Sequence, residues 1–163
     1  MNLTKTYSGL TRVQLIRRLR AAEQDAALHR LVMDVAPVLI AYVDSGERYR
    51  LINATYETWY GLRREEILGR RVQEVVGEEI YARVGPSIAR VLAGELQTFT
   101  GRLSIGMVER DVMTVMTPHR ATDGSVVGYC FILQEITELR REKEALQRSE
   151  ERLRAFADAT FEG

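Results

Sequence analysis

Residues 37–62 read PVLIAYVDSGERYRLINATYETWYGL, and this stretch decides the fold of the chain. Pro37 breaks any helix before it, and the run 38–43 has the β-branched and aromatic character of a strand. Residues 44–47 supply turn chemistry, so 48–52 becomes the second strand of a hairpin. Asn53 then caps a short helix over 54–60, because its side-chain oxygen can accept from first-turn amides. Gly61 ends that helix as a C′ glycine.

Upstream of the hairpin, residues 11–33 have the period of an amphipathic helix with Thr11 as its N-cap. One stripe at spacings of three and four holds Leu15, Leu19, Ala22, Ala26, His29 and Met33. Two places for this stripe stay open. It packs either on the sheet of its own domain or against a second copy, where Leu15, Leu19 and Ala26 would be dimer contacts.

Downstream of the hairpin, the pattern predicts helices and then three strands. A short helix covers 64–68, and a longer one covers 78–92 with a kink or restart near Pro86, which cannot donate a backbone hydrogen bond. Strands follow at 99–105, 110–117 and 126–134, with turns at Gly106 and at 122–124. The run 126–133 is apolar on both faces, so both should be covered. The fold class is α+β, with a five-stranded antiparallel sheet.

Residues 137–156 read as a charged helix that leaves the domain. Its leucines, Leu139, Leu146 and Leu153, fall seven residues apart, as in a coiled coil. Because each heptad has only one leucine, the sequence predicts marginal pairing. Such a helix is better suited to being switched than to clamping a dimer.

Length, charge balance and cysteine content limit the classes of protein to which the chain can belong. The 163 residues suit one domain with flanking helices, and 23 basic against 23 acidic residues give zero formal charge. This balance argues against whole-domain attraction to nucleic acid or to a membrane surface. One cysteine excludes an internal disulfide and suits a reducing compartment. With no apolar run of the ~18–20 residues that a membrane span needs, and no signal-peptide pattern, we expect a cytoplasmic protein.

With this order laid out, residues 36–137 resemble a PAS domain. The resemblance rests on 37–62, on REEILGR at 64–70, and on DGSVVGYCFILQEIT at 123–137. The family's exit motif normally reads Asp-Ile-Thr, and here it is Glu135, Ile136 and Thr137. We expect Thr137 to cap the exit helix, and Glu135 to hold the strand end to it through a charge partner elsewhere on the domain.

The resemblance implies a PAS-like sheet with helices on one face, often around a small-molecule cavity. It implies N-terminal and C-terminal linker helices, in residues 1–35 and 138–163, around a sensory domain at 36–137. It also implies a homodimer and a downstream effector in the same parent chain, such as a two-component histidine kinase or a nucleotide cyclase or phosphodiesterase. Residues 149–163 resemble the lead-in to a second such domain.

No cofactor or metal site is predicted. Haem-binding members of the family carry a histidine on the long helix before the third strand, and 78–92 has none. The light-sensing branch carries an asparagine–cysteine motif that 63–74 lacks, and Cys130 lies in an apolar strand where a thiol is usually inert. His29 and His119 are isolated, which makes each a poor metal ligand. The chain shows no catalytic spacing and no Gly-rich phosphate loop, so we expect a non-catalytic module.

A cluster of side chains is the candidate pocket for a small apolar ligand. Its members are Asn53, Tyr56, Trp59, Tyr60, Met113, Val115, Tyr129, Phe131 and Leu133. Simple core packing and a cavity with a few polar groups, such as Asn53 or Thr114, both fit this set. The prediction is a sensory and dimerisation module that relays ligand or partner binding through its C-terminal helix. The alternative is a ligand-free interaction and dimerisation scaffold.

Overall fold

The computed structural model describes residues 11–105 and 108–161, and the chain falls into two units, Met1–Ala36 and Pro37–Gly163. The first unit contributes α1 (Arg12–Asp34), which Thr11 caps as predicted: the Thr11 hydroxyl accepts from the Gln14 amide, and the Gln14 side chain accepts from the Thr11 amide. No residue of α1 is buried. The partner of its apolar stripe therefore stays a prediction.

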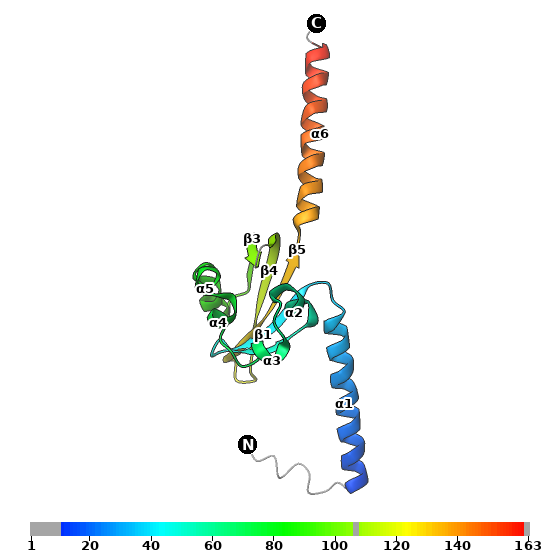
Figure 1. Ribbon diagram of the computed structural model, residues 1–163, viewed down its shortest axis with the longest axis vertical. Helices are drawn as coiled ribbons and strands as arrows, with labels where there is room; N and C mark the ends of the chain where they lie inside the picture. The colour runs from blue at the N-terminus through cyan, green and yellow to red at the C-terminus, as the bar shows by residue number, and fades with distance from the viewer. Residues whose placement is uncertain (1–10, 106–107, 162–163) are drawn as a thin grey trace. The chain divides into compact units, whose positions relative to one another are not determined.

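The second unit is built on one antiparallel sheet in the order β2-β1-β5-β4-β3 (Figure 1). The strands are β1 (Leu39–Asp44), β2 (Tyr49–Ile52), β3 (Gln97–Ile105), β4 (Val108–Arg120) and β5 (Val126–Glu135). The first strand pairs with the last, with Ala41 opposite Phe131, so β1 and β5 lie inside the sheet and β2 and β3 form its two edges. The predicted α+β class and five-stranded antiparallel sheet are confirmed. The turn predicted at Gly106 lies outside the described residues.

Four helices connect β2 to β3, namely α2 (Ala54–Tyr60), α3 (Arg64–Ile67), α4 (Val72–Val76) and α5 (Glu78–Leu92). α4 was not predicted. It has five residues, too few to show a helical period, and its first turn is closed by Glu74, whose carboxylate accepts from the Arg71 amide at 2.7 Å. α5 runs through Pro86, so the predicted restart is absent. The buried Ile88 and Val91 hold the second half of α5 on the core.

The helices and the inner face of the sheet enclose the core. Alternate strand residues face inward, as in Leu39, Ala41 and Val43 of β1, which are all buried. On the other face, Tyr42 and Cys130 are half-buried, and Ile132 keeps 42% of its surface exposed. The inner face of β5 is therefore covered as predicted, and a cover for its outer face stays a prediction.

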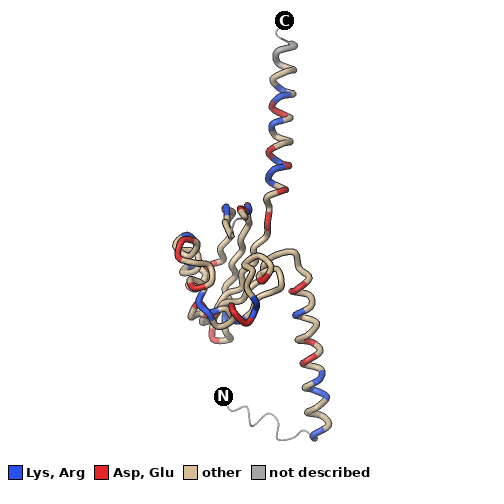
Figure 2. The backbone as a smooth tube through the Cα atoms, in the orientation of Figure 1, with Lys and Arg blue, Asp and Glu red and all other residues tan. Residues whose placement is uncertain are grey.

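The exit helix α6 (Thr137–Phe161) begins directly after β5. Basic and acidic residues are interspersed along its length (Figure 2). The three stripe leucines, Leu139, Leu146 and Leu153, are each more than 60% exposed. None of the helices in the described ranges is long and apolar enough to cross a bilayer.

Candidate ligand cavity and exit junction

Asn53 anchors the first helix to the first strand. Its side-chain oxygen accepts from the Tyr56 amide at 3.3 Å, which is the predicted N-cap bond, and from the Ile40 amide at 3.0 Å. Its amide nitrogen donates to the Val38 carbonyl at 2.8 Å. Asn53 is fully buried, and its side chain satisfies the backbone on both sides. We assign it a structural role, because it lies outside the cavity described next.

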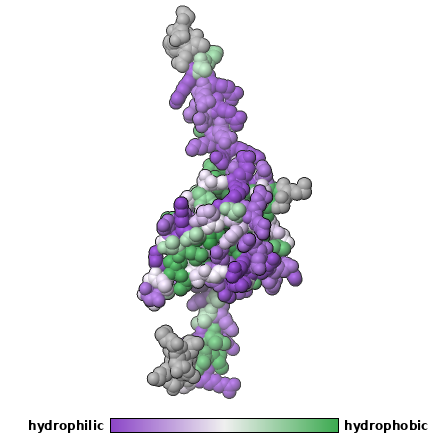
Figure 3. Space-filling model, turned by 90° about the vertical axis from the view of Figure 1, so that its left-hand side faces the viewer, coloured by the Kyte–Doolittle hydropathy of each residue, from purple (hydrophilic) through white to green (hydrophobic). Residues whose placement is uncertain are grey.

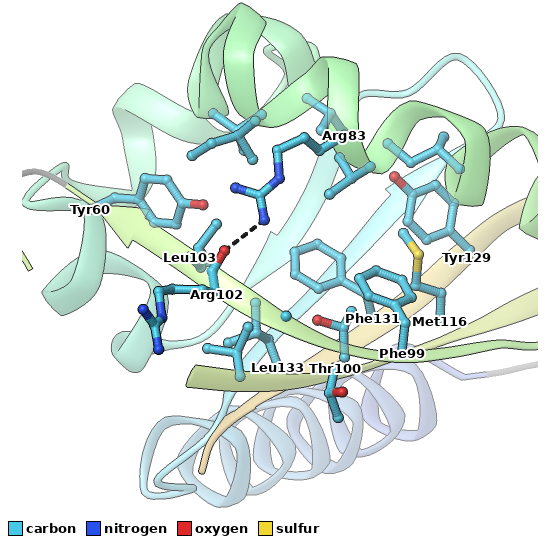
Figure 4. Close-up of a pocket in the computed structure, with 18 of the residues that line it drawn as sticks. Tyr60, Arg83, Phe99, Thr100, Arg102, Leu103, Met116, Tyr129, Phe131 and Leu133 are labelled. Atoms are coloured by element: carbon cyan, nitrogen blue, oxygen red, sulfur yellow. Dashed lines mark hydrogen bonds between the residues drawn. The ribbon is translucent and has the colours of Figure 1, made fainter. Parts of the chain in front are cut away.

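A cavity of about 190 Å³ lies between the inner face of the sheet and the helices. Figure 4 shows its walls, with α5 on one side and strands of the sheet on the other. The lining is predominantly apolar. It comprises Tyr49, Tyr60, Val72, Val76, Ile80, Arg83, Val84, Ile88, Phe99, Thr100, Gly101, Arg102, Leu103, Val112, Thr114, Met116, Tyr129, Phe131 and Leu133.

Part of the predicted pocket lies on this cavity. Tyr60, Tyr129, Phe131 and Leu133 line it, together with Thr114, the polar group predicted beside them. Asn53, Tyr56 and Trp59 do not line it, because their side chains are used within the core and in the contacts of α2.

The prediction that Met113 and Val115 line the pocket is wrong, because the alternation of inward and outward side chains along the strand was assigned one residue out of step. In β4 it is Val112, Thr114 and Met116 that are buried and line the cavity. Successive strand residues point to opposite faces, so Met113 and Val115 belong to the outer face of the sheet. Both kinds of position in β4 carry apolar residues, and apolar character alone therefore did not reveal the phase.

The contribution of α5 was missed altogether. Ile80, Val84 and Ile88 line the cavity at spacings of four residues, which places them on one face of the helix. This spacing is present in the sequence and is the signal that identifies the wall. Two cationic residues also line the cavity: Arg83 on α5 and Arg102 on the edge strand β3.

Three tyrosines, Tyr49, Tyr60 and Tyr129, line the cavity, and Tyr56 packs beside them in the core. The Tyr56 hydroxyl donates to the Tyr49 hydroxyl at 2.6 Å, and the Tyr56 and Tyr60 rings stack at 4.7 Å. Burial raises the pKa of Tyr60 to about 12, and it also raises the pKa of Tyr49, Tyr56 and Tyr129. A phenol is already neutral near pH 7, and the raised pKa values keep these hydroxyls neutral into alkaline solution as well.

The three predicted exit residues meet β4 where β5 passes into α6. The Glu135 carboxylate accepts from the Arg110 guanidinium at 2.6 Å, which identifies the charge partner. Arg110 also lies over the Trp59 ring, 4.5 Å from its centroid. The Ile136 amide donates to the Asp111 carbonyl at 2.7 Å.

The predicted N-cap role of Thr137 is wrong. α6 begins at Thr137 itself, and the Thr137 hydroxyl accepts from the Asp111 amide at 2.9 Å and donates to Glu135 at 3.1 Å. Its hydroxyl is therefore committed to β4 and β5. Thr137 joins strand to helix, but it does so by holding the sheet rather than the helix's own first turn.

Asp111 connects the edge strand to the exit helix. Its carboxylate accepts from Arg140 of α6 at 3.1 Å and lies 3.5 Å from Nε of Arg102 on β3. The Asp111 side chain is 13% exposed, whereas both arginines are largely exposed. One shielded carboxylate thus holds two cations from different elements. Arg102 belongs to this junction and also lines the cavity.

The remaining candidate groups are dispersed. Cys130 is half-buried, and burial raises the pKa of its thiol, which disfavours the reactive thiolate. His119 lies 2.8 Å from the Tyr42 hydroxyl, and His29 lies on the surface of α1. Over the described ranges, no three His, Cys, Asp or Glu side chains come together as a metal site would require.

Comparison with known proteins gives consistent matches. A family model described as the PAS fold matches residues 33–141. The methanogenesis regulatory histidine kinase FilI of Methanothrix harundinacea (strain 6Ac) is 31% identical over 135 residues. That alignment takes in 81% of this chain and 15% of FilI, so the chain spans a small part of that relative.

Two solved structures share the fold. The PAS domain of Bordetella pertussis BvgS aligns with a TM-score of 0.59 and 25% identity, over 77% of this chain and 98% of that chain. The Vibrio cholerae VqmA dimer, in the absence of its target DNA, aligns with a TM-score of 0.61 and 19% identity, over 69% and 52%. The second likeness concerns the fold alone.

Proposed function

The chain belongs to the PAS fold family of sensory domains, and we propose that it senses a small molecule in its cavity and relays binding to a downstream effector through α6. The observation that carries this proposal is the position of Arg102. Arg102 is one of the residues that line the cavity, and its carbonyl accepts from Arg83 of the cavity wall. Its side chain reaches the Asp111 carboxylate that also holds Arg140 of α6. Arg102 therefore links the cavity to the exit helix, through the Asp111 carboxylate that both Arg102 and Arg140 contact.

The relay works as a population shift. β3 is the edge strand of the sheet and pairs with β4 alone, with Arg102 opposite Asp111. A ligand that moves β3 changes how strongly Arg102 competes with Arg140 for Asp111. The ligand then favours one setting of the first turn of α6 over another, to the extent that it binds the two settings with different affinity.

The alternative, a ligand-free scaffold, requires a filled interior. A cavity of about 190 Å³ with mainly apolar walls supports the ligand-binding function instead. Assembly is a separate part of the proposal: the exposed leucines of α6 and the apolar side chains of α1 would be dimer contacts. We propose a cytoplasmic, non-catalytic module without a resident cofactor, and a kinase as its effector, because the FilI relative is a histidine kinase.

A cavity-filling variant tests the relay without a known ligand. Val84→Phe on α5 adds a ring to the cavity wall, and Ala89→Phe adds the same ring to an exposed position of the same helix. We expect Val84→Phe to change hydrogen exchange at the Ile136 and Arg140 amides, whose acceptors are Asp111 and Ile136. Ala89→Phe should leave both unchanged. Unchanged exchange in a folded Val84→Phe variant would contradict the relay.

A further inference from the structure

We propose that the cavity takes a small apolar molecule with an anionic end, such as an aromatic carboxylate, and that Arg83 binds the anion. This inference deepens the proposed function, since it names the ligand class of the same cavity. It rests on three observations, namely the size of the cavity, the character of its walls, and the position and partners of Arg83.

The size limits the ligand to about one ring. An engineered apolar cavity of about 150 Å³ accepts benzene, and this cavity measures about 190 Å³. A benzene ring with one or two further carbons therefore fills it. A long acyl chain or a dinucleotide would not fit whole inside this volume.

The walls require the enclosed part of the ligand to be apolar. Val84, Ile88, Phe99 and Leu133 present hydrocarbon. The tyrosine hydroxyls nearby are neutral near pH 7, since a phenol ionises only near pH 10 and burial raises the pKa of Tyr60 and Tyr129 further. A charged group among these side chains would lose its hydration without an opposite charge to replace it. Any charge on the ligand must therefore lie at the rim. In the space-filling view, green apolar residues show between purple polar ones on the side of the domain that carries α5 (Figure 3).

Arg83 is the cation at that rim. Arg83 is exposed to solvent as a whole, yet it lines the cavity. Its Nη2 donates to the Arg102 backbone carbonyl at 2.7 Å (Figure 4). Across residues 11–105 and 108–161, no carboxylate pairs with Arg83, whereas the Arg102 guanidinium is turned away toward Asp111. A guanidinium has five donors in a planar fork that matches a carboxylate, so Arg83 has donors left for an anion.

Binding of an anion at Arg83 would also affect the contacts of Asp111 at the start of α6. The bond from Arg83 to the Arg102 carbonyl fastens α5 to the edge strand. A carboxylate attracts a guanidinium more strongly than a neutral carbonyl does, so an anionic ligand draws Arg83 toward itself and loosens this fastening. Arg102 is the residue that contacts Asp111, and an anion at the rim thus acts at the start of the relay.

The test compares two probes of nearly equal shape. Phenylacetate is anionic at pH 7, and phenylacetamide is neutral. We expect wild-type protein to bind phenylacetate about tenfold more tightly than phenylacetamide in an NMR or calorimetric titration, a preference typical of one charge-assisted contact. Arg83→Gln should remove this preference by weakening phenylacetate alone. Arg83→Lys should keep part of it, because the charge remains without the fork.

Arg90→Gln is the matched control, since Arg90 is an exposed arginine of the same helix that does not line the cavity. It should keep the full preference. Equal affinity for both probes in the wild type, or a preference that survives Arg83→Gln, overturns the anion site but leaves a cavity that binds apolar molecules. If neither these probes nor ethylbenzene bind, the anion site and the ligand-sensing function fail together.

Discussion

At the scale of single residues, the side chain of Asn53 makes more backbone hydrogen bonds than the capping of a helix requires. It caps α2 and also closes hydrogen bonds to Ile40 and Val38 on the first strand. The sequence predicted the cap, because an asparagine between a strand and a helix is a local signal. The bonds to β1 depend on the pairing of the hairpin in space, and no local pattern revealed them.

Replacing Asn53 should therefore cost more than a lost cap. Asn53→Ala leaves the Ile40 amide and the Val38 carbonyl without this buried partner, and we expect a loss of about 3 kcal/mol in the free energy of unfolding. Urea unfolding measures it. Thr58→Ala is the control on the same helix, because Thr58 is exposed and its hydroxyl donates to the Ala54 carbonyl of its own helix. It should change stability by less than about 0.5 kcal/mol. Equal losses in the two variants would refute the dual role of Asn53.

The buried tyrosines make the fold sensitive to alkali. Burial raises the pKa of Tyr60 to about 12 and raises the pKa of Tyr49, Tyr56 and Tyr129, whereas an unfolded chain has phenol pKa values near 10. The stabilisation is complete below a pH of about 10 and is lost as the pH rises through the folded-state values. The urea midpoint should fall as the pH rises above about 10, and these four phenols should ionise in absorbance only as the fold is lost. Ionisation of all the phenols near pH 10 in an intact fold would contradict this account.

Substitutions at Thr137 distinguish a hydrogen bond to strand β4 from a capping role at the start of α6. Thr137→Val removes the acceptor of the Asp111 amide, so that amide should exchange about tenfold faster, in keeping with about 1.4 kcal/mol for one lost bond. Thr137→Ser keeps the hydroxyl and serves as the control. If Thr137→Val accelerates only the amides of the first turn of α6, Thr137 acts as a cap instead.

At the scale of elements, the helices and strands that were predicted from the sequence are those with a clear local pattern of apolar and polar residues. The opening hairpin, α2, α1 and the three long strands were predicted because alternation, turn residues and caps agreed with one another. Met113 and Val115 were placed on the wrong face because both faces of β4 are apolar. The same ambiguity hid the cavity, since an inward-facing side chain lines a void or fills it according to the position of α5, which long-range packing decides.

α6 is the element whose pairing can be tested alone. Its three leucines stay exposed in the single chain, so dimerisation through this stripe predicts that Leu146→Glu lowers the molecular mass measured by light scattering from dimer toward monomer. Ala145→Glu adds the same charge about 100° around the helix and should have a smaller effect. A mass that stays dimeric in Leu146→Glu would exclude pairing through this stripe.

At the scale of the whole domain, the proposed relay depends on one chain of contacts. The cavity borders β3, β3 carries Arg102, Arg102 shares Asp111 with Arg140, and Arg140 belongs to α6. Individually these pairs, in which each arginine is about half or more exposed, contribute little to stability, often less than about 1 kcal/mol. Weak pairs suit a relay, because a small change at the cavity is then enough to redistribute them.

The most direct test of this relay is a double-mutant cycle between cavity and junction. Val84→Phe fills the cavity, Arg102→Met removes the contact with Asp111, and the opening free energy of the Ile136 amide, which bonds to Asp111, is measured by hydrogen exchange in all four proteins. The account predicts that Val84→Phe shifts this free energy in the wild type, that the shift largely disappears with Arg102→Met, and that the coupling is about 0.5 kcal/mol or more. Additive effects within about 0.3 kcal/mol would contradict it.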